Sequence, residues 1–122
     1  MRFVLLAFAL FIPASVPAQE APQRIEVQLS SFDFTPSTIR LSAGRPVVLH
    51  LVNSGGGGHN FAAPEFFAAA QGVEGPVERG RVEVPGRQSV DIRLTPARGT
   101  YRLRCTHTLH TSFGMTGEIV VE

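Results

Sequence analysis

The chain has 122 residues, a formal net charge of +1 at pH 7, and hydrophobic side chains at 43% of its positions. This length is enough for one domain with a modest core but not for two. The balance of 11 basic and 10 acidic residues excludes a strongly basic surface, so we predict that the protein binds no nucleic acid.

The N-terminus has the features of a secretory signal peptide. Arg2 gives a short basic region, residues 3–12 form an apolar run, and Val16-Pro17-Ala18 places small residues before a cleavage site. The apolar run is shorter than the roughly 20 residues that a membrane-spanning helix needs, and an uncleaved membrane anchor is the alternative interpretation. We therefore predict a cleaved signal peptide over residues 1–18, a single domain over residues 19–122, and export to the periplasm.

From Arg24 onward the sequence alternates apolar and polar residues with the period of two that half-buried strands show. Residues 64–71 begin with proline and contain three alanines, which predicts one short helix or a loop excursion, and residues 71–80 predict a loop. Short strands separated by proline and glycine turns predict an all-β fold, an antiparallel sandwich or barrel. The predicted strands are 25–29, 38–41, 47–52, 81–84, 90–94, 101–105 and 118–121.

Cys105 is the one cysteine of the chain. Exported proteins usually pair their cysteines, so a single cysteine is an inert core thiol, a nucleophile or a metal ligand. Tyr101, Leu103 and Cys105 share one face of the predicted strand, and their apolar character marks it as the inward face. We therefore expect the thiol to point inward at the end of the strand, with Arg102 and Arg104 facing water.

Two loops carry the side chains that a copper site requires. His59 follows a run of four glycines, and Cys105, His107, His110 and Met115 precede the last predicted strand. One thiolate, two imidazoles and one thioether make up the ligand set of a trigonal copper site with a long axial methionine. Thiolate and thioether stabilise Cu(I) and imidazole suits both oxidation states, so such a set allows one electron to move with little rearrangement.

The sequence resembles the cupredoxin family, the small blue copper electron carriers that include plastocyanin, azurin, pseudoazurin and rusticyanin. The resemblance covers essentially the whole mature chain. Its motifs are Phe32-Asp33-Phe34-Thr35-Pro36, Leu41-Ser42-Ala43-Gly44, His59-Asn60-Phe61, Gly99-Thr100-Tyr101 leading into Cys105, and Met115 followed by Gly117-Glu118-Ile119-Val120-Val121. The resemblance implies a Greek-key β-sandwich or barrel. It also implies one mononuclear copper ion held by His59, Cys105, His110 and, more weakly, Met115.

The function that the resemblance implies is electron transfer by a periplasmic type 1 copper protein that cycles between Cu(II) and Cu(I), not enzymatic catalysis. Its partners would be redox proteins, such as a cytochrome or a copper oxidase or reductase, that dock transiently onto a monomer. No small-molecule substrate is expected. We expect Phe61, Leu109 and Phe113 to supply an apolar docking patch, and Asn60 resembles the asparagine that braces the ligand loop by hydrogen bonding.

His107 departs from the plainest form of the family pattern. If His107 were the ligand, one residue would separate it from Cys105 and seven would separate it from Met115. Four residues separate His110 from each of them, as in longer-looped members such as rusticyanin. We therefore predict His110 as the ligand. A residue two positions beyond Cys105 tends to point the same way. His107 is then a fifth ligand, a neighbour that tunes the potential, or a surface residue.

The alternative function is a copper-binding or delivery protein that handles the ion without redox cycling. Clustered methionines would favour it, but Met115 is the one methionine beyond the predicted signal peptide. A third hypothesis is an enzyme, either a copper oxidase fragment or a thiol hydrolase; the histidines suffice for one copper centre, and no motif supplies an orienting group. His50 lies within a predicted strand, and we expect it to be structural, with a hydrogen-bond partner.

Overall fold

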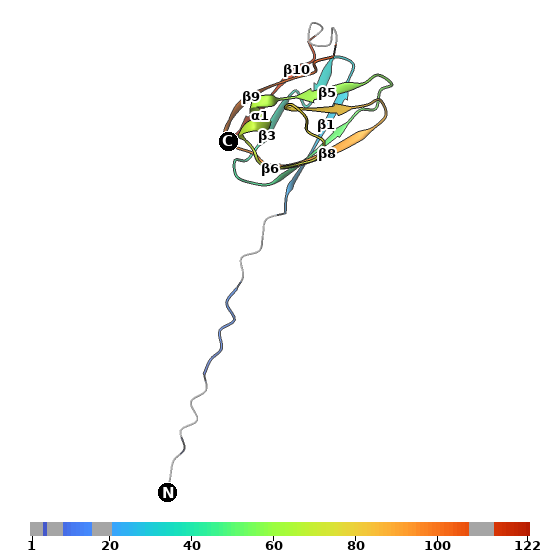
Figure 1. Cartoon of the computed structure of the whole chain (residues 1–122). Helices are drawn as coiled ribbons and strands as arrows, with labels where there is room; N and C mark the ends of the chain where they lie inside the picture. The colour runs from blue at the N-terminus through green and yellow to red at the C-terminus, as the bar shows by residue number, and fades with distance from the viewer. Residues whose placement is uncertain (1–3, 5–8, 16–20, 108–113) are drawn as a thin grey trace.

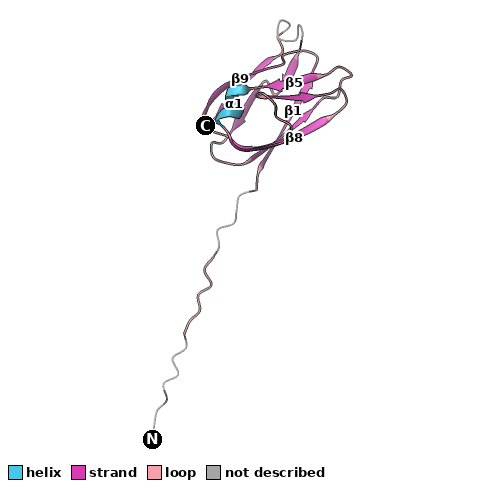
Figure 2. Ribbon diagram, in the orientation of Figure 1, coloured by secondary structure: helices cyan, strands magenta, loops and turns pink. Residues whose placement is uncertain are grey.

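The computed structural model describes residues 4, 9–15, 21–107 and 114–122. Two five-stranded sheets pack against each other and a single short helix lies beside them in this part of the chain (Figures 1 and 2). This confirms the predicted all-β sandwich. The elements are β1 (Gln23–Ser30), β2 (Asp33–Thr35), β3 (Thr38–Leu41), β4 (Val47–Val52), β5 (His59–Ala62), α1 (Pro64–Ala69), β6 (Gln71–Glu74), β7 (Arg81–Val84), β8 (Ser89–Thr95), β9 (Gly99–Arg104) and β10 (Thr116–Val121).

The strand order is β2-β1-β4-β8-β6 in the first sheet and β3-β10-β9-β5-β7 in the second. Most neighbouring strands are antiparallel, as predicted, but β1 pairs with β4 in parallel and β3 pairs with β10 in parallel. Parallel neighbours need a crossover between them instead of a hairpin. Between β1 and β4 the chain visits the second sheet to form β3, and this excursion provides the crossover.

The period of two identified the longer strands with one buried face, but it missed the three-residue β2 and the two strands that do not alternate. Residues of β5 are all buried, and those of β6 are all exposed, so neither strand alternates. The prediction of a loop over residues 71–80 is therefore wrong for β6. That strand lies at a sheet edge, where Gln71 pairs with Thr95 across an irregular register. The helix α1 ends two residues before the predicted boundary, and its two phenylalanines are buried.

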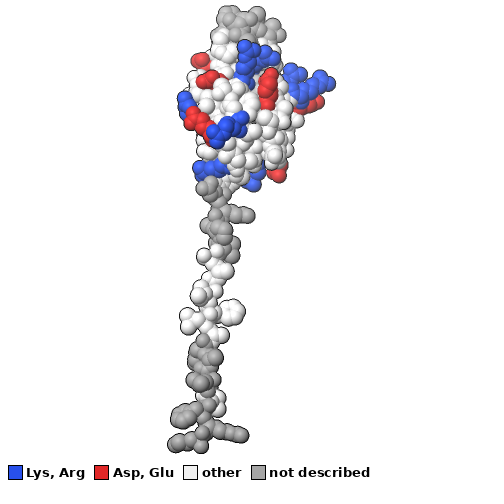
Figure 3. Space-filling model, turned by 90° about the vertical axis from the view of Figure 1, so that its left-hand side faces the viewer, with Lys and Arg blue, Asp and Glu red and all other residues white. Residues whose placement is uncertain are grey.

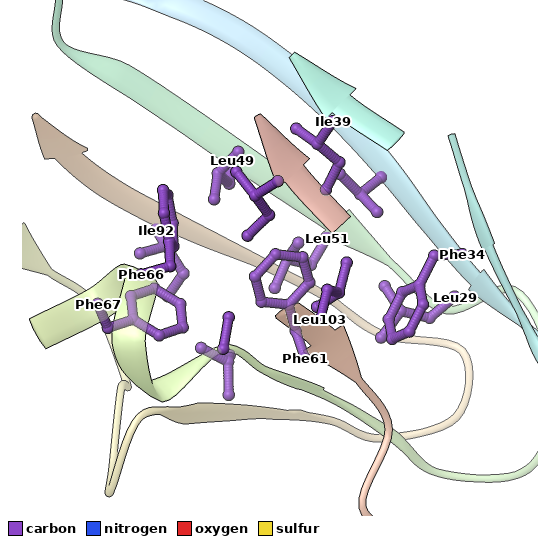
Figure 4. Packing of buried hydrophobic residues seen from close by; sticks show 14 of the residues in the cluster. Leu29, Phe34, Ile39, Leu49, Leu51, Phe61, Phe66, Phe67, Ile92 and Leu103 are labelled. Carbon is purple, nitrogen blue, oxygen red and sulfur yellow. The ribbon is translucent and has the colours of Figure 1, made fainter. Parts of the chain in front are cut away.

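Inward-facing side chains of both sheets form one hydrophobic core. Phe61 lies in this cluster, with its ring centroid 6.1 Å from that of Phe34 and 6.0 Å from that of Phe67, both in edge-to-face contact (Figure 4). Burying a side chain of this size contributes about 1.5–3 kcal/mol. Leu103 is 1% exposed, Cys105 is fully buried, and the arginines between and before them are exposed, as the alternation predicted.

The described residues of the N-terminal apolar run, Val4 and residues 9–12, lie outside this core. Residues 9–15 form neither helix nor strand, and Leu10, Phe11 and Ile12 are 86%, 97% and 81% exposed. Across the described ranges, no helix has the length and apolar character needed to cross a bilayer.

The charged surface mixes both signs. Figure 3 shows arginine side chains beside acidic ones on the face that it displays. On the outer face of the first sheet, His50 of β4 is paired in register with Asp91 of β8, and its Nδ1 lies 2.6 Å from Asp91 Oδ1. Arg24 Nη1 lies 3.8 Å from the other carboxylate oxygen. The hydrogen-bond partner expected for His50 is therefore present.

This cross-strand contact makes stability depend on pH. The hydrogen bond from His50 outweighs the small opposing effect of burial and, with the charge of Arg24, lowers the pKa of Asp91 from its usual 3.8. A carboxyl group whose pKa is lowered by folding stabilises the fold above its unfolded pKa, and this contribution is lost as the pH falls through the folded value. We expect the stability lost in Asp91→Asn to be greatest above pH 3.8 and to shrink below it.

Urea unfolding of both proteins across a pH series measures this effect. Asp33→Asn, which changes an exposed carboxylate on β2, is the matched control. A stability difference between wild type and Asp91→Asn that did not vary with pH would contradict the prediction.

Candidate metal centre

The described members of the predicted ligand set lie at strand ends and are buried. His59 is the first residue of β5, Cys105 directly follows β9, and Met115 directly precedes β10. Cys105 and Met115 are fully buried and His59 is 6% exposed. The fourth predicted ligand, His110, lies outside the described residues.

Backbone contacts bring the three described ligand segments together. In the antiparallel pair of β5 and β9, Ala62 lies opposite Arg104. Just beyond, the Asn60 N–H donates to Cys105 Sγ at 3.4 Å, and the Cys105 N–H donates to the Met115 carbonyl at 3.1 Å. The residue after His59 thus contacts the thiol, and the two ends of the loop from Cys105 to Met115, the ligand loop, are joined.

Asn60 braces the start of the ligand loop, as the resemblance implied. Its Oδ1 accepts from the Thr106 N–H at 2.8 Å, and its Nδ2 donates to Thr106 Oγ1 at 2.7 Å and to Glu83 Oε1 at 3.0 Å. Asn60 is 1% exposed, so these bonds face little competition from water. These hydrogen bonds fix the backbone beside Cys105. Hydrogen bonds of this kind, from residues that do not touch the metal, orient the residues that do.

Asn53 holds the glycine loop, residues 54–58, that leads into His59. Its Nδ2 donates to the Gly57 carbonyl at 2.8 Å and to the Val84 carbonyl at 3.0 Å, while its Oδ1 accepts from the Gly55 N–H at 3.1 Å. Asn53 was not predicted as part of the site. The available signal was a polar side chain at the end of an apolar strand, directly before a segment rich in glycine.

The chemistry of these residues fits a copper ion. Cys105 forms no disulfide, since the chain has no second cysteine, and its sulfur receives a backbone N–H. Across the ranges that the structure describes, no three His, Cys, Asp or Glu side chains are grouped so that they could hold a metal. Of the predicted ligands, only His59 and Cys105 are both described and of these four residue types, because Met115 is a thioether and His110 lies outside the described residues. A soft thiolate, a thioether and imidazole are copper donors.

His107 does not share the orientation of Cys105, which corrects one expectation. Its Nε2 lies 2.8 Å from Oε2 of Glu83, and its side chain is 34% exposed. Glu83 lies between the buried Val82 and Val84 on β7, so it faces outward from the second sheet. Strand β9 has already ended at Arg104, and the chain bends at His107, so the alternation of a strand no longer applies. Glu83 was not identified from the sequence.

The expected docking patch also needs correction. Phe61 is fully buried, because β5 turns its ring into the core. Leu109 and Phe113 lie outside the described residues. Phe32, which is 38% exposed, instead lines a surface hollow of about 390 Å³ together with the glycine loop and His59.

Comparisons with known proteins agree with this architecture. A family model described as a cupredoxin-like domain matches residues 2–121. The structure of auracyanin B is similar with a TM-score of 0.64 and 26% identity, covering 86% of this chain and 93% of that one. No curated protein matches the sequence.

Two further solved structures share the fold at lower identity. Auracyanin A, a "blue" copper protein from Chloroflexus aurantiacus, matches with a TM-score of 0.61 and 21% identity, covering 84% of this chain and all of that one. The multicopper oxidase McoA from Aquifex aeolicus matches with a TM-score of 0.66 and 17% identity, covering 88% of this chain but only 31% of that one.

The role of Asn53 can be tested by truncation. In Asn53→Ala the buried carbonyl of Val84 and the backbone of the glycine loop lose their partners, and we expect the metal-free protein to lose about 1–3 kcal/mol of unfolding free energy. Urea unfolding of the metal-free proteins measures this loss of unfolding free energy. Gln88→Ala is the control, because the exposed Gln88 contacts Asn53 through its backbone carbonyl alone. Equal stability of the two variants would contradict the assignment.

Proposed function

The chain belongs to the cupredoxin-like domain family, and from that membership we propose that it is a type 1 copper protein that carries single electrons between redox partners. One observation carries the proposal. The buried thiol of Cys105 accepts a hydrogen bond from the N–H of Asn60, the residue after His59. The N–H of Cys105 in turn donates to the carbonyl of Met115. Similarity to auracyanin B supports the same conclusion.

The described residues of the predicted ligand set are enclosed by the fold. His59, Cys105, His110 and Met115 would hold the copper ion, which supplies a one-electron couple when it is bound. Cys105 and Met115 are inaccessible to water, and a hydrogen bond from the Cys105 N–H to the Met115 carbonyl joins their backbones. Such fixed ligands limit the rearrangement that accompanies a change of oxidation state. The N–H donor at the cysteine sulfur is a group that adjusts the reduction potential.

The alternative of copper delivery predicts different behaviour. A protein that delivers metal exchanges its ion readily with chelators, whereas a preorganised electron carrier retains it and shows a reversible potential. The burial of His59, Cys105 and Met115 favours the carrier. We also propose that the protein has no catalytic turnover, because catalytic metal sites keep a coordination position open for substrate.

We propose that the partners are redox proteins that dock briefly onto a monomer, with no small-molecule substrate. Interfaces of such transient complexes are below about 1,200 Å². Beside His59, the hollow formed by Phe32 and the glycine loop offers a small surface without charged side chains. A surface of that size and character suits a short-lived encounter.

The copper-loaded protein tests the main proposal. We expect intense visible absorption in the Cu(II) form, lost on reduction, because a thiolate ligand donates charge to the metal. Cys105→Ser should lose this absorption while it remains folded, since serine is close to cysteine in size. Absorption and paramagnetic resonance spectra measure both results. A colourless Cu(II) complex of the wild-type protein would contradict the proposal.

We further propose that residues 1–18 are a signal peptide and that the mature protein works in the periplasm. The high exposure of Leu10, Phe11 and Ile12 supports this, because an apolar run outside the core contributes nothing to the stability of the domain. We expect the protein recovered from the periplasmic fraction to begin at Gln19, as measured by intact mass. Recovery in the membrane fraction with the N-terminus intact would favour the anchor alternative.

A further inference from the structure

Glu83 joins two residues that flank the predicted copper ligands. It lies on β7 directly opposite Asn60 of β5. Its Oε1 accepts from Asn60 Nδ2 at 3.0 Å, and its Oε2 lies 2.8 Å from Nε2 of His107. One carboxylate therefore connects the residue after His59 with a residue of the ligand loop.

The hydrogen-bond partners of Glu83 and His107 determine where the proton between these two side chains lies. Partial burial alone would raise the pKa of Glu83, but hydrogen bonds from His107 and Asn60, with the charges of His107 and Arg81, outweigh it and lower the pKa. An ionised carboxylate only accepts hydrogen bonds, so the Nε2 of His107 must carry a proton and donate it. The Nε2 atom therefore has no lone pair for a metal, while Nδ1 keeps one. What holds His107 away from the predicted ligands is the outward orientation of its ring, which the contact with Glu83 fixes.

The ring of His107 is also fixed by its surroundings on the outer side of the second sheet. A side chain at Gly58 would place its first carbon 3.4 Å from His107 Cε1, so the ring packs over the glycine loop. His107 is 34% exposed, whereas His59 is 6% exposed and Cys105 is fully buried. The imidazole thus connects β7, the glycine loop and the ligand loop on the face opposite the buried thiol.

We propose that Glu83 is a positioning residue for the copper centre: by holding Asn60 and His107 on its two oxygens, it fixes the ligand loop to β7 and keeps the His107 ring off the metal. This inference rests on the copper function proposed above. Of the two histidines that follow Cys105, it leaves His110 to bind copper.

The hydrogen bond itself is tested in the metal-free protein by nitrogen-15 NMR of the histidine rings. In wild type we expect the proton of His107 on Nε2 and slow exchange of that proton with water. Glu83→Ala should lose the slow exchange. Glu118→Gln, which changes an exposed carboxylate on β10 of the same sheet, should leave it unchanged. A wild-type ring with its proton on Nδ1 alone would overturn the proposal even if no Glu83 variant folds.

The consequence for the metal is tested in the Cu(II) proteins. We expect His107→Ala to keep the intense visible absorption and His110→Ala to lose it. Glu83→Ala should change the ratio of the visible bands and the copper hyperfine splitting, because the released imidazole of His107 then reaches the metal. The double variant Glu83→Ala/His107→Ala should return to the spectrum of His107→Ala, a rescue that a merely structural role of Glu83 would not produce.

The outcomes separate this inference from the function on which it rests. A colourless copper complex of wild type would overturn both. Intense absorption in wild type that His107→Ala loses and His110→Ala keeps would overturn the positioning role alone. Identical copper spectra for wild type and Glu83→Ala would also overturn it and leave the copper function intact.

Discussion

The hydrogen bonds of Asn60 are the interaction on which the candidate centre depends. Its side chain fixes the backbone of Thr106, and its own N–H contacts the sulfur of Cys105. Asn60 directly follows His59, so one residue sets the relation between a histidine on one strand and a cysteine at the end of another. The bonds lie in a buried environment, where an unsatisfied partner is costly and a satisfied one is held firmly.

The two faces of the second sheet carry different kinds of side chain beside the candidate site. Along β5 and β7 the inward positions carry core side chains and the predicted ligand His59, and the outward positions carry Asn60 and Glu83. The thiol therefore lies among apolar groups, while the polar groups that orient its backbone lie behind it. The candidate site is therefore apolar on its inward side and hydrogen-bonded on its outward side, an arrangement that would hold metal ligands in fixed positions.

The family relationship and the local geometry support one another. The fold match covers 93% of auracyanin B but only 31% of McoA, so this chain corresponds in extent to a part of that oxidase. Fold alone does not define function. The candidate site supports the proposed function independently, because Cys105 and Met115 are buried and a hydrogen bond joins their backbones.

Periodicity by itself determined the longer strands with one buried face and the inward direction of Cys105, because these follow from local alternation. Donor chemistry predicted the types of ligand. The edge strand β6 and the parallel pairs depend on long-range backbone pairing, which has no local signature. Only the tertiary structure placed Glu83 beside His107 and Asn60, since these residues come from three separate segments. The bend after β9 likewise decided that His107 faces outward, because alternation predicts direction only while a strand continues.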